Sequence, residues 1–312
     1  MTVRWILCLI ALLAGGPARA ALYWVTVAGL GGEAEYEQRF AGEAAEVDKL
    51  LKTHATDTHA YTLSGSGATR EHLEQILKQV AHEAGPSDQL VLLLIGHGTF
   101  DGAIYKFNLP GPDITAAQLA ALCDHVAAGT QLIINTTSSS GGSVAALRRR
   151  GRAVIAATKS GTEKNATVFS RYFVEALQDP GADVDKSDSI SALEAFDYAT
   201  RKTASFYAAE KRLATEHAVF EDTGKGDPVR EKSATGEGRV LAGLTLVSFG
   251  RVGDDNQNPA KRELLAKKEK LQQQIDILKY QKAAMAEAQY ASQLKSLLLQ
   301  LARTQALLDK PP

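Results

Sequence analysis

Residues 88–98, DQLVLLLIGHG, decide the fold class of this chain of 312 residues. Six consecutive apolar residues, Leu90 to Ile95, end abruptly at a glycine. An unbroken apolar run of this length is typical of a strand buried on both faces, as in a parallel sheet covered by helices. His97 follows directly, between two glycines, at the carboxyl end of this predicted strand.

Similar runs recur along the chain and alternate with stretches of helical spacing. The predicted strands besides 88–98 are 22–30, 60–65, 130–136, 153–158 and, as a possible edge strand, 239–249. The predicted helices are 33–54, 68–85, 113–129, a brief one at 142–150, 166–178 and 189–215. This alternation predicts an α/β fold: a three-layer sandwich with a mostly parallel six-stranded sheet and helices on both faces.

The first 20 residues have the pattern of a secretory signal peptide. Arg4 precedes a short apolar stretch, and a small-residue ending, ARA, precedes Ala21. The apolar stretch is too short for a membrane span. We therefore expect a secreted or periplasmic protein without a span in its mature chain, in which Cys123 is the remaining cysteine and no internal disulfide forms. The alternative is an uncleaved N-terminal anchor.

The net charge of −1 conceals an uneven distribution. Residues 259–312 carry eight Lys, two Arg and five acidic residues, so this segment is basic and the body is acidic. No basic patch interspersed with aromatic residues is present in the sequence, which argues against nucleic-acid binding.

Two loops at the predicted carboxyl ends of strands are candidate functional sites, because ligands and catalytic residues are found there in parallel sheets. The first is GHGTFDG (96–102), and the second is TTSSSGGS (136–143). With the strand context and the spacing of about forty residues, they resemble the caspase-like cysteine peptidases, which include legumains, metacaspases and gingipains. His97-Gly98 matches the His-Gly of that family, and 137–141 (TSSSG) matches its Ala-Cys-x-Ser-Gly. Three further segments are similar to bacterial relatives: 105–115, 157–161 and 216–227.

This resemblance spans about residues 21–250 and implies a histidine base, a cysteine nucleophile and backbone N–H groups that stabilise the oxyanion. His97 takes the place of the base, the N–H of Gly98 that of an oxyanion donor, and Ser138 stands where the family has its cysteine. A thiol ionises readily, whereas a serine normally needs a base oriented by a third group. We therefore expect a pseudopeptidase that acts as a binding or assembly scaffold for protein or peptide partners.

Other interpretations stay open. The domain is alternatively an active endopeptidase with a Ser138/His97 dyad, and Thr137 takes the nucleophile position if the alignment slips by one residue. A third interpretation is an ordinary α/β ligand-binding domain. Cys123 and His125 are two residues apart on a predicted helix, so they point to different sides and form no catalytic pair.

Residues 183–194, DVDKSDSISALE, have part of a calcium-loop pattern. Asp183, Asp185, Ser187 and Glu194 occupy ligand positions, together with Ser189. Asp188 stands where such loops need a glycine, and Ser191 with Glu194 forms a capping box for the next helix. The capping box is the favoured interpretation, and no cofactor is expected beyond this weak calcium candidate.

The C-terminal segment 259–309, after a linker at 251–258, has a different pattern. Leucine or methionine recurs every seven residues, and the phase shifts between Met285 and Leu294, which indicates a stutter or a bend. The positions are Leu264, Leu271, Leu278, Met285, Leu294, Leu301 and Leu308, with Ile275 reinforcing them. We expect a long coiled-coil helix, about 75 Å if straight, that self-associates or binds a partner helix; the alternative is a helix folded back onto the domain.

Overall fold

A computed structural model describes residues 20–54, 58–233, 236–249 and 259–309. The strands are β1 (Leu22–Ala28), β2 (Thr58–Leu63), β3 (Gln89–Ile95), β4 (Gly98–Phe100), β5 (Tyr105–Phe107), β6 (Ile114–Thr115), β7 (Thr130–Asn135), β8 (Arg152–Ala156), β9 (Ser189–Ser191), β10 (Val219–Glu221) and β11 (Thr245–Ser248). The α-helices are α1 (Ala34–His54), α2 (Arg70–Glu83), α3 (Ala116–Asp124), α4 (Val144–Leu147), α5 (Phe169–Ala176), α6 (Ala192–Ala209), α7 (Arg239–Ala242), α8 (Pro259–Tyr280) and α9 (Glu287–Leu308). Short 3₁₀ helices are η1 (Gly65–Gly67), η2 (Ser140–Ser143), η3 (Pro180–Ala182) and η5 (Gln281–Ala284).

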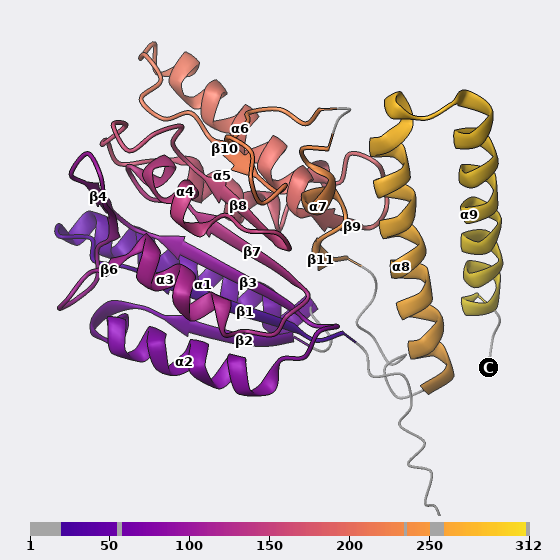
Figure 1. Ribbon diagram of the computed structural model, residues 1–312, viewed down its shortest axis with the longest axis horizontal. Helices are drawn as coiled ribbons and strands as arrows, with labels where there is room; N and C mark the ends of the chain where they lie inside the picture. Colours follow the sequence, from indigo (N-terminus) through magenta and orange to yellow (C-terminus); the bar gives the residue numbers. More distant parts are fainter. Residues whose placement is uncertain (1–19, 55–57, 234–235, 250–258, 310–312) are drawn as a thin grey trace, which may run out of the picture.

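The predicted α/β architecture is confirmed. A six-stranded sheet has the order β10-β8-β7-β3-β1-β2, in which all neighbours are parallel except β10 and β8 (Figure 1). The apolar run that predicted the central strand forms β3, which lies between β1 and β7 and is buried from Leu90 to Ile95. A strand in the middle of a parallel sheet has both faces covered, and this explains why its residues do not alternate.

Each face of the sheet packs against its own set of helices. One apolar core joins the sheet to α1, α5 and α6 and contains Trp24, Phe40 and Phe196. The other core joins the opposite face to α2, α3 and α4 and contains Leu73, Leu77 and Leu119. At the start of α2 the side chain of Thr69 caps the helix by accepting a hydrogen bond from the N–H of His72.

The sixth strand of the sheet is not the predicted one. The structure uses β10, and the segment predicted as an edge strand instead forms α7 and β11, which pairs with β9 in a separate two-stranded sheet. Asp222 accepts hydrogen bonds from the N–H groups of Gly238 and Val240 at the start of α7, which stabilises a helical turn there. Since β10 has three residues, its pattern was too short to be recognised.

The C-terminal segment is not one long helix. It forms two helices, α8 and α9, that turn back on each other at η5, so that α9 is the outermost element of the molecule (Figure 1). The predicted bend is present, but its turn at η5 precedes the interval of shifted phase, Met285 to Leu294, most of which lies within α9. The straight helix of about 75 Å was wrong.

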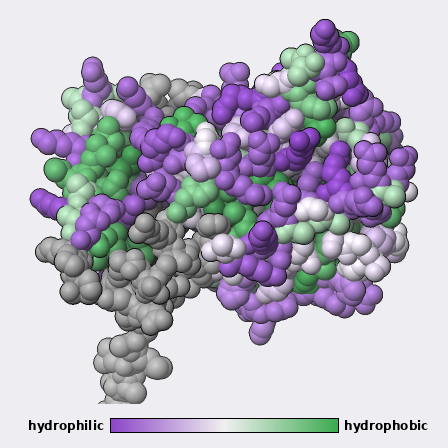
Figure 2. Space-filling view, turned by 180° about the vertical axis from the view of Figure 1, so that it is seen from behind, coloured by the Kyte–Doolittle hydropathy of each residue, from purple (hydrophilic) through white to green (hydrophobic). Residues whose placement is uncertain are grey.

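Helix α8 packs on the body of the protein, in agreement with the alternative prediction that the helix folds back onto the domain. Figure 2 shows the hairpin of α8 and α9 beside the body, with apolar residues on its surface. Leu271, Ile275 and Leu278 of α8 are buried. The side-chain amide of Gln272 donates to the carbonyl oxygen of Ser187, and Lys279 pairs with Asp185 at 3.1 Å. The heptad stripe of α8 is thus covered within the chain itself.

No helix among the described residues is long and apolar enough to cross a membrane. The predicted signal peptide, apart from Ala20, and the predicted linker 251–258 lie outside the described residues.

Candidate functional site

The structure brings the two predicted loops together at one edge of the sheet. Strands β3 and β7 are parallel neighbours whose last paired residues are Leu94 and Asn135. The loops that carry His97 and Ser138 begin directly after these residues. The backbone N–H of Gly98 donates to Ser138 Oγ at 3.1 Å, and Ser138 Oγ donates to the carbonyl oxygen of Gly98 at 3.1 Å.

Gly98 has no room for a side chain. A Cβ at this position would lie 2.6 Å from the carbonyl oxygen of Ser138, from Thr137 Oγ1 and from a ring carbon of Tyr105. The close approach of the two loops therefore requires glycine here. This steric need explains the His-Gly pair independently of any catalytic role.

The His97 ring is held on the other side, against helix α1. Its centroid is 4.8 Å from that of Tyr36 and 5.2 Å from that of Phe40, with both rings in edge-on arrangement. Burial lowers the pKa of His97, as does the nearby guanidinium of Arg39, while a hydrogen bond to the backbone of Gly31 opposes the shift. The imidazole is thus favoured in its neutral form. Among the described residues, no hydrogen bond joins this ring to the Ser138 hydroxyl.

Thr137, the alternative nucleophile, is completely buried. Its hydroxyl contacts the Tyr105 hydroxyl at 2.6 Å and donates to Asn135 Oδ1 at 2.9 Å. Burial also raises the pKa of Tyr105, so that its hydroxyl stays protonated. A hydroxyl enclosed in such a network stabilises the end of β7 and has no access to a substrate.

The serine-rich loop turns sharply at Ser139, whose φ of 57° is in the left-handed region. The Ser139 hydroxyl is buried and has no hydrogen-bond partner, while its backbone N–H donates to the carbonyl oxygen of Glu163. Ser140 Oγ accepts from the N–H of Thr158 at 3.0 Å, and the Thr158 hydroxyl accepts from the N–H of Gly141 at 2.9 Å. The hydroxyls of Ser140 and Thr158 therefore satisfy backbone groups where the ends of β7 and β8 meet.

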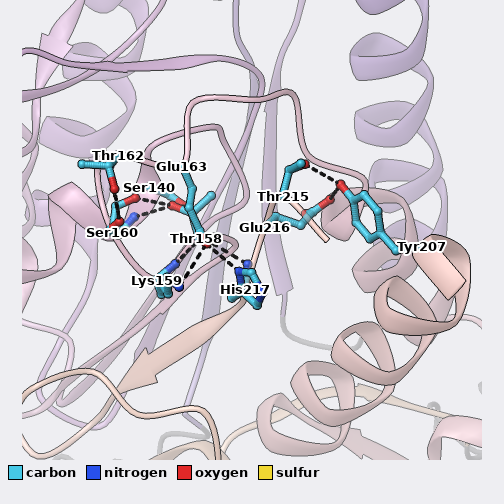
Figure 3. Close-up of polar contacts among 11 residues, drawn as sticks. Ser140, Thr158, Lys159, Ser160, Thr162, Glu163, Tyr207, Thr215, Glu216 and His217 are labelled. Atoms are coloured by element: carbon cyan, nitrogen blue, oxygen red, sulfur yellow. Dashed lines mark hydrogen bonds and ion pairs between the residues drawn. The ribbon is translucent and has the colours of Figure 1, made fainter. Parts of the chain in front are cut away.

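Glu163 is a residue of this region that no sequence pattern selected. Its carboxylate contacts His217 Nδ1 at 2.5 Å and accepts from the N–H groups of His217 and Lys159 (Figure 3). The carbonyl oxygen of Glu163 also accepts a hydrogen bond from the N–H of Ser139. Glu163 therefore connects the serine-rich loop to the chain before β10. The segments 157–161 and 216–227, which were noted for their resemblance to bacterial relatives, flank this contact.

The neighbouring Glu216 has a structural role. Its carboxylate accepts from the N–H groups of Val168 and Phe169 at the start of α5 and from the Tyr207 hydroxyl. Figure 3 shows Tyr207 and Thr215 on one side of Glu216, and Glu163 on the other side. Burial raises the pKa of Glu216, and its hydrogen bonds oppose that shift.

Cys123 is buried in α3, and burial raises the pKa of its thiol to about 11. His125 lies at the end of that helix and is exposed. The two side chains therefore have different surroundings, Cys123 in the core and His125 at the surface, as expected of residues on different sides of a helix.

The calcium-like loop also has the geometry of the favoured interpretation. Ser191 and Glu194 form the predicted capping box at the start of α6. Carboxylate oxygens of Asp183, Asp185 and Glu194 lie within 4.8 Å of one another, and Asp183 accepts from the N–H groups of Ser187 and Asp188. Ser187 and Ser189 contact each other through their hydroxyls at 2.9 Å.

The backbone of Asp188 differs from the expectation for a residue with a side chain at this position of the loop. Asp188 adopts a φ of 60°, the left-handed conformation that a side chain at this position was expected to resist. Aspartate enters this conformation more readily than most residues because its short polar side chain bonds to the backbone locally.

No protein-family model matches the chain, and no curated protein matches it. Among solved structures, it is similar to the Drosophila initiator caspase Dronc, with 9% identity, a TM-score of 0.44, and coverage of 67% of this chain and 82% of that one. It is also similar to a protein from Geobacter sulfurreducens, with 14% identity, a TM-score of 0.45, and coverage of 68% of this chain and 96% of that one. Both similarities concern the fold and assign no role to any residue of this chain.

Proposed function

We propose that this chain is a caspase-like peptidase homologue that no longer cleaves peptide bonds, and that its domain binds protein or peptide partners as a scaffold. A single observation carries the proposal: the Ser138 hydroxyl is hydrogen-bonded to both backbone groups of Gly98. Ser138 is also only 3% exposed.

The first consequence concerns the nucleophile. In this arrangement the Ser138 proton is donated to a carbonyl oxygen, and the His97 ring is held by Gly31 and the aromatic residues of α1. A serine attacks a carbonyl only when a base within hydrogen-bond reach removes its proton. The neutral form of the His97 imidazole could serve as a base. The Ser138 hydroxyl, however, donates its proton to the carbonyl oxygen of Gly98 and not to this ring.

The second consequence concerns the oxyanion. The resemblance assigns the N–H of Gly98 to stabilising the oxyanion, and in this structure that N–H donates to Ser138 Oγ. A donor that is already satisfied provides no preorganised stabilisation of a developing charge. The serine therefore supplies no nucleophile and at the same time occupies a donor that catalysis needs.

The alternative is an active endopeptidase with a Ser138/His97 dyad. It is favoured by the adjacent ends of β3 and β7 and by a neutral imidazole. It requires the Ser138 side chain to rotate away from Gly98 toward the ring, with loss of both hydrogen bonds.

The test is hydrolysis of a library of unstructured peptides by the wild-type chain, with Ser138→Ala as the matched control. We expect no hydrolysis above background from either protein. Robust wild-type hydrolysis that Ser138→Ala abolishes would establish the serine dyad instead. Hydrolysis that survives Ser138→Ala but not Thr137→Ala would move the nucleophile by one residue.

A second measurement tests the geometry directly. In Ser138→Cys the new thiol should be alkylated slowly in the native protein, because position 138 is buried against Gly98 and Ser138 makes no hydrogen bond to the imidazole. The buried Cys123 serves as an internal comparison. Rapid alkylation of Cys at 138 below neutral pH would show that His97 does reach this position.

The location of the protein is part of the proposal. A signal peptide at residues 1–20 would direct it to the periplasm or outside the cell. Expression of the full chain in a bacterium, fractionation and N-terminal sequencing would test this; a protein retained in the cytoplasm with its first residue intact would refute it.

A further inference from the structure

The first strand of the sheet begins beside a carboxylate. The backbone N–H of Ala21, one residue before β1, donates to Asp88 Oδ1 at 2.8 Å. The carbonyl oxygen of Ala21 accepts from the N–H of Gln89 at 2.9 Å, and Leu22 pairs with Gln89 at the start of β3. Of the described residues, Ala21 is thus the first whose N–H and carbonyl groups both bond to the body.

Asp88 is fixed in this position by the turn in which it lies. Its other carboxylate oxygen accepts from the N–H of Gly85 at 2.8 Å. Its own N–H donates to the carbonyl oxygen of Gly85, and its carbonyl oxygen accepts from the N–H of Gly129, both at 3.0 Å. A carboxylate that is already held in place loses little conformational entropy when a further group binds to it.

The charge of Asp88 has no positive partner. In the part of the chain that the structure describes, its carboxylate accepts only from neutral backbone N–H groups and forms no ion pair with Lys, Arg or His. Burial raises the pKa of the Tyr23 hydroxyl in β1, and the charges of Glu83 and Asp88 raise it further. The start of β1 is therefore a place of negative potential.

The sequence has a cleavage signal at the same place. The ending Ala-Arg-Ala at residues 18–20, with small residues at its first and last positions, is typical of the bond that a signal peptidase hydrolyses. Ala20 is exposed, and Ala21 is half-buried. Hydrolysis adds one water and breaks the C–N bond between them. Ala20 then leaves with a carboxylate, and the nitrogen of Ala21 becomes an α-amino group that is protonated at neutral pH.

We propose that cleavage between Ala20 and Ala21 by a signal peptidase creates an ion pair between the new α-ammonium group and Asp88, so that processing stabilises the mature fold. The nitrogen that donates to Asp88 as an amide then carries a positive charge, and a hydrogen bond from an ammonium group to a carboxylate is the stronger of the two. The cleavage rests on the proposed export of the chain, whereas the ion pair at an Ala21 terminus does not.

The neighbouring peptide bonds would not give this result. Cleavage after Ala21 would remove the carbonyl group that accepts from Gln89. Cleavage before Ala20 would place the ammonium group on that exposed residue, about 3.3 Å further along an extended chain. The contacts of β1 therefore favour the same bond as the Ala-Arg-Ala ending.

Thermal unfolding at pH 6.5 of two chains tests the ion pair. One chain begins at Ala21, and the other has a short neutral Gly-Ser extension before Ala21. Because Asp88 is partly exposed, solvent screens the pair, and we expect the chain that begins at Ala21 to melt only about 2–4 °C higher. Equal melting temperatures of the two chains would refute the ion pair.

Variants of both chains assign the difference to Asp88. With Asp88→Asn the difference should disappear. Since this change disturbs the bond to Gly85 in both chains alike, the comparison isolates the contact at Ala21. Glu83→Gln changes the nearby carboxylate that does not contact Ala21, and the difference should remain. A difference that persists with Asp88→Asn would contradict the proposal.

Processing is measured separately, on the full chain expressed with its first 20 residues in a bacterium. N-terminal sequencing of the exported protein should begin at Ala21, and any other first residue would refute the cleavage site. A chain that stays in the cytoplasm with its first residue intact would refute both the export and the cleavage. The unfolding experiment would then still decide whether Asp88 pairs with an ammonium group at Ala21.

Discussion

The serine loop allows a stability test in which two adjacent serines are expected to behave differently. Ser138→Ala removes a hydroxyl that makes two hydrogen bonds to the backbone of Gly98, whereas Ser139→Ala removes a hydroxyl that is buried without a partner. If the loop is a structural element, the first change is costly and the second is not. If Ser138 is instead held ready for catalysis, its removal should be tolerated by the fold.

The magnitude follows from the contacts. Each lost hydrogen bond contributes about 1 kcal/mol, and leaving a buried group without a partner adds a further penalty, so Ser138→Ala should cost about 2–3 kcal/mol. For a domain of this size one kcal/mol corresponds to roughly 2–4 °C in Tm, which predicts a decrease of about 4–12 °C. Ser139→Ala should change Tm by no more than about 2 °C, because it deletes no hydrogen bond.

The assay is thermal unfolding followed by circular dichroism, with chemical denaturation to obtain the free energy of unfolding. Equal effects of the two substitutions would refute the reasoning, and so would an increase in Tm for Ser138→Ala. Ser138→Thr offers a further control, because it keeps the hydroxyl while adding a methyl group at a site with little free volume. It should destabilise through steric conflict.

Further predictions concern a buried acid, a buried base and the calcium-like loop. Burial raises the pKa of Glu43, and the ion pair with Arg39 at 3.7 Å opposes that shift only in part. The stabilising contribution of Glu43 is therefore complete below the unfolded pKa of about 4.3 and is lost as pH rises through the higher folded value. Glu43→Gln should therefore raise Tm at pH 8 more than at pH 4, and the exposed Glu46→Gln on the same helix should not; denaturation at the two pH values checks this. Arg152 is 1% exposed and donates to Gln131 Oε1 at 2.8 Å, so Arg152→Leu should reduce the free energy of unfolding by on the order of 3 kcal/mol in urea titrations. Calcium at millimolar concentration should leave Tm unchanged, whereas Asp183→Ala should lower it without calcium; a rise with calcium that Asp183→Ala abolishes would establish a cation site.

The pattern of apolar residues was sufficient for most of the sheet. Runs such as 90–95 have no polar alternation, and that feature by itself indicates a strand covered on both faces. The edge of the sheet was not predictable in the same way. Strand β10 has three residues and depends on pairing with β8, a contact distant in sequence.

The candidate site was predictable in its location and only partly in its geometry. Strand order and the position of His97 and Ser138 at strand ends placed them at one edge of the sheet. The direction of each side chain was decided by other segments, since α1 supplies Tyr36 and Phe40 to the imidazole. Glu163 joins the site by a contact with His217 that no spacing in the sequence reveals.

The C-terminal segment shows which features the sequence determines locally and which depend on the tertiary structure. Its heptads determined that it is helical, and the shift of phase between Met285 and Leu294 indicated a bend, because both properties depend on residues close together in the chain. The turn itself lies earlier, at 281–284. Only the tertiary structure decided that α8 packs on the body and that Leu298, Leu299 and Leu307 of α9 are exposed. The surface that covers an apolar stripe is set by complementary side chains from segments distant in the sequence. The local periodicity of the stripe does not identify those segments.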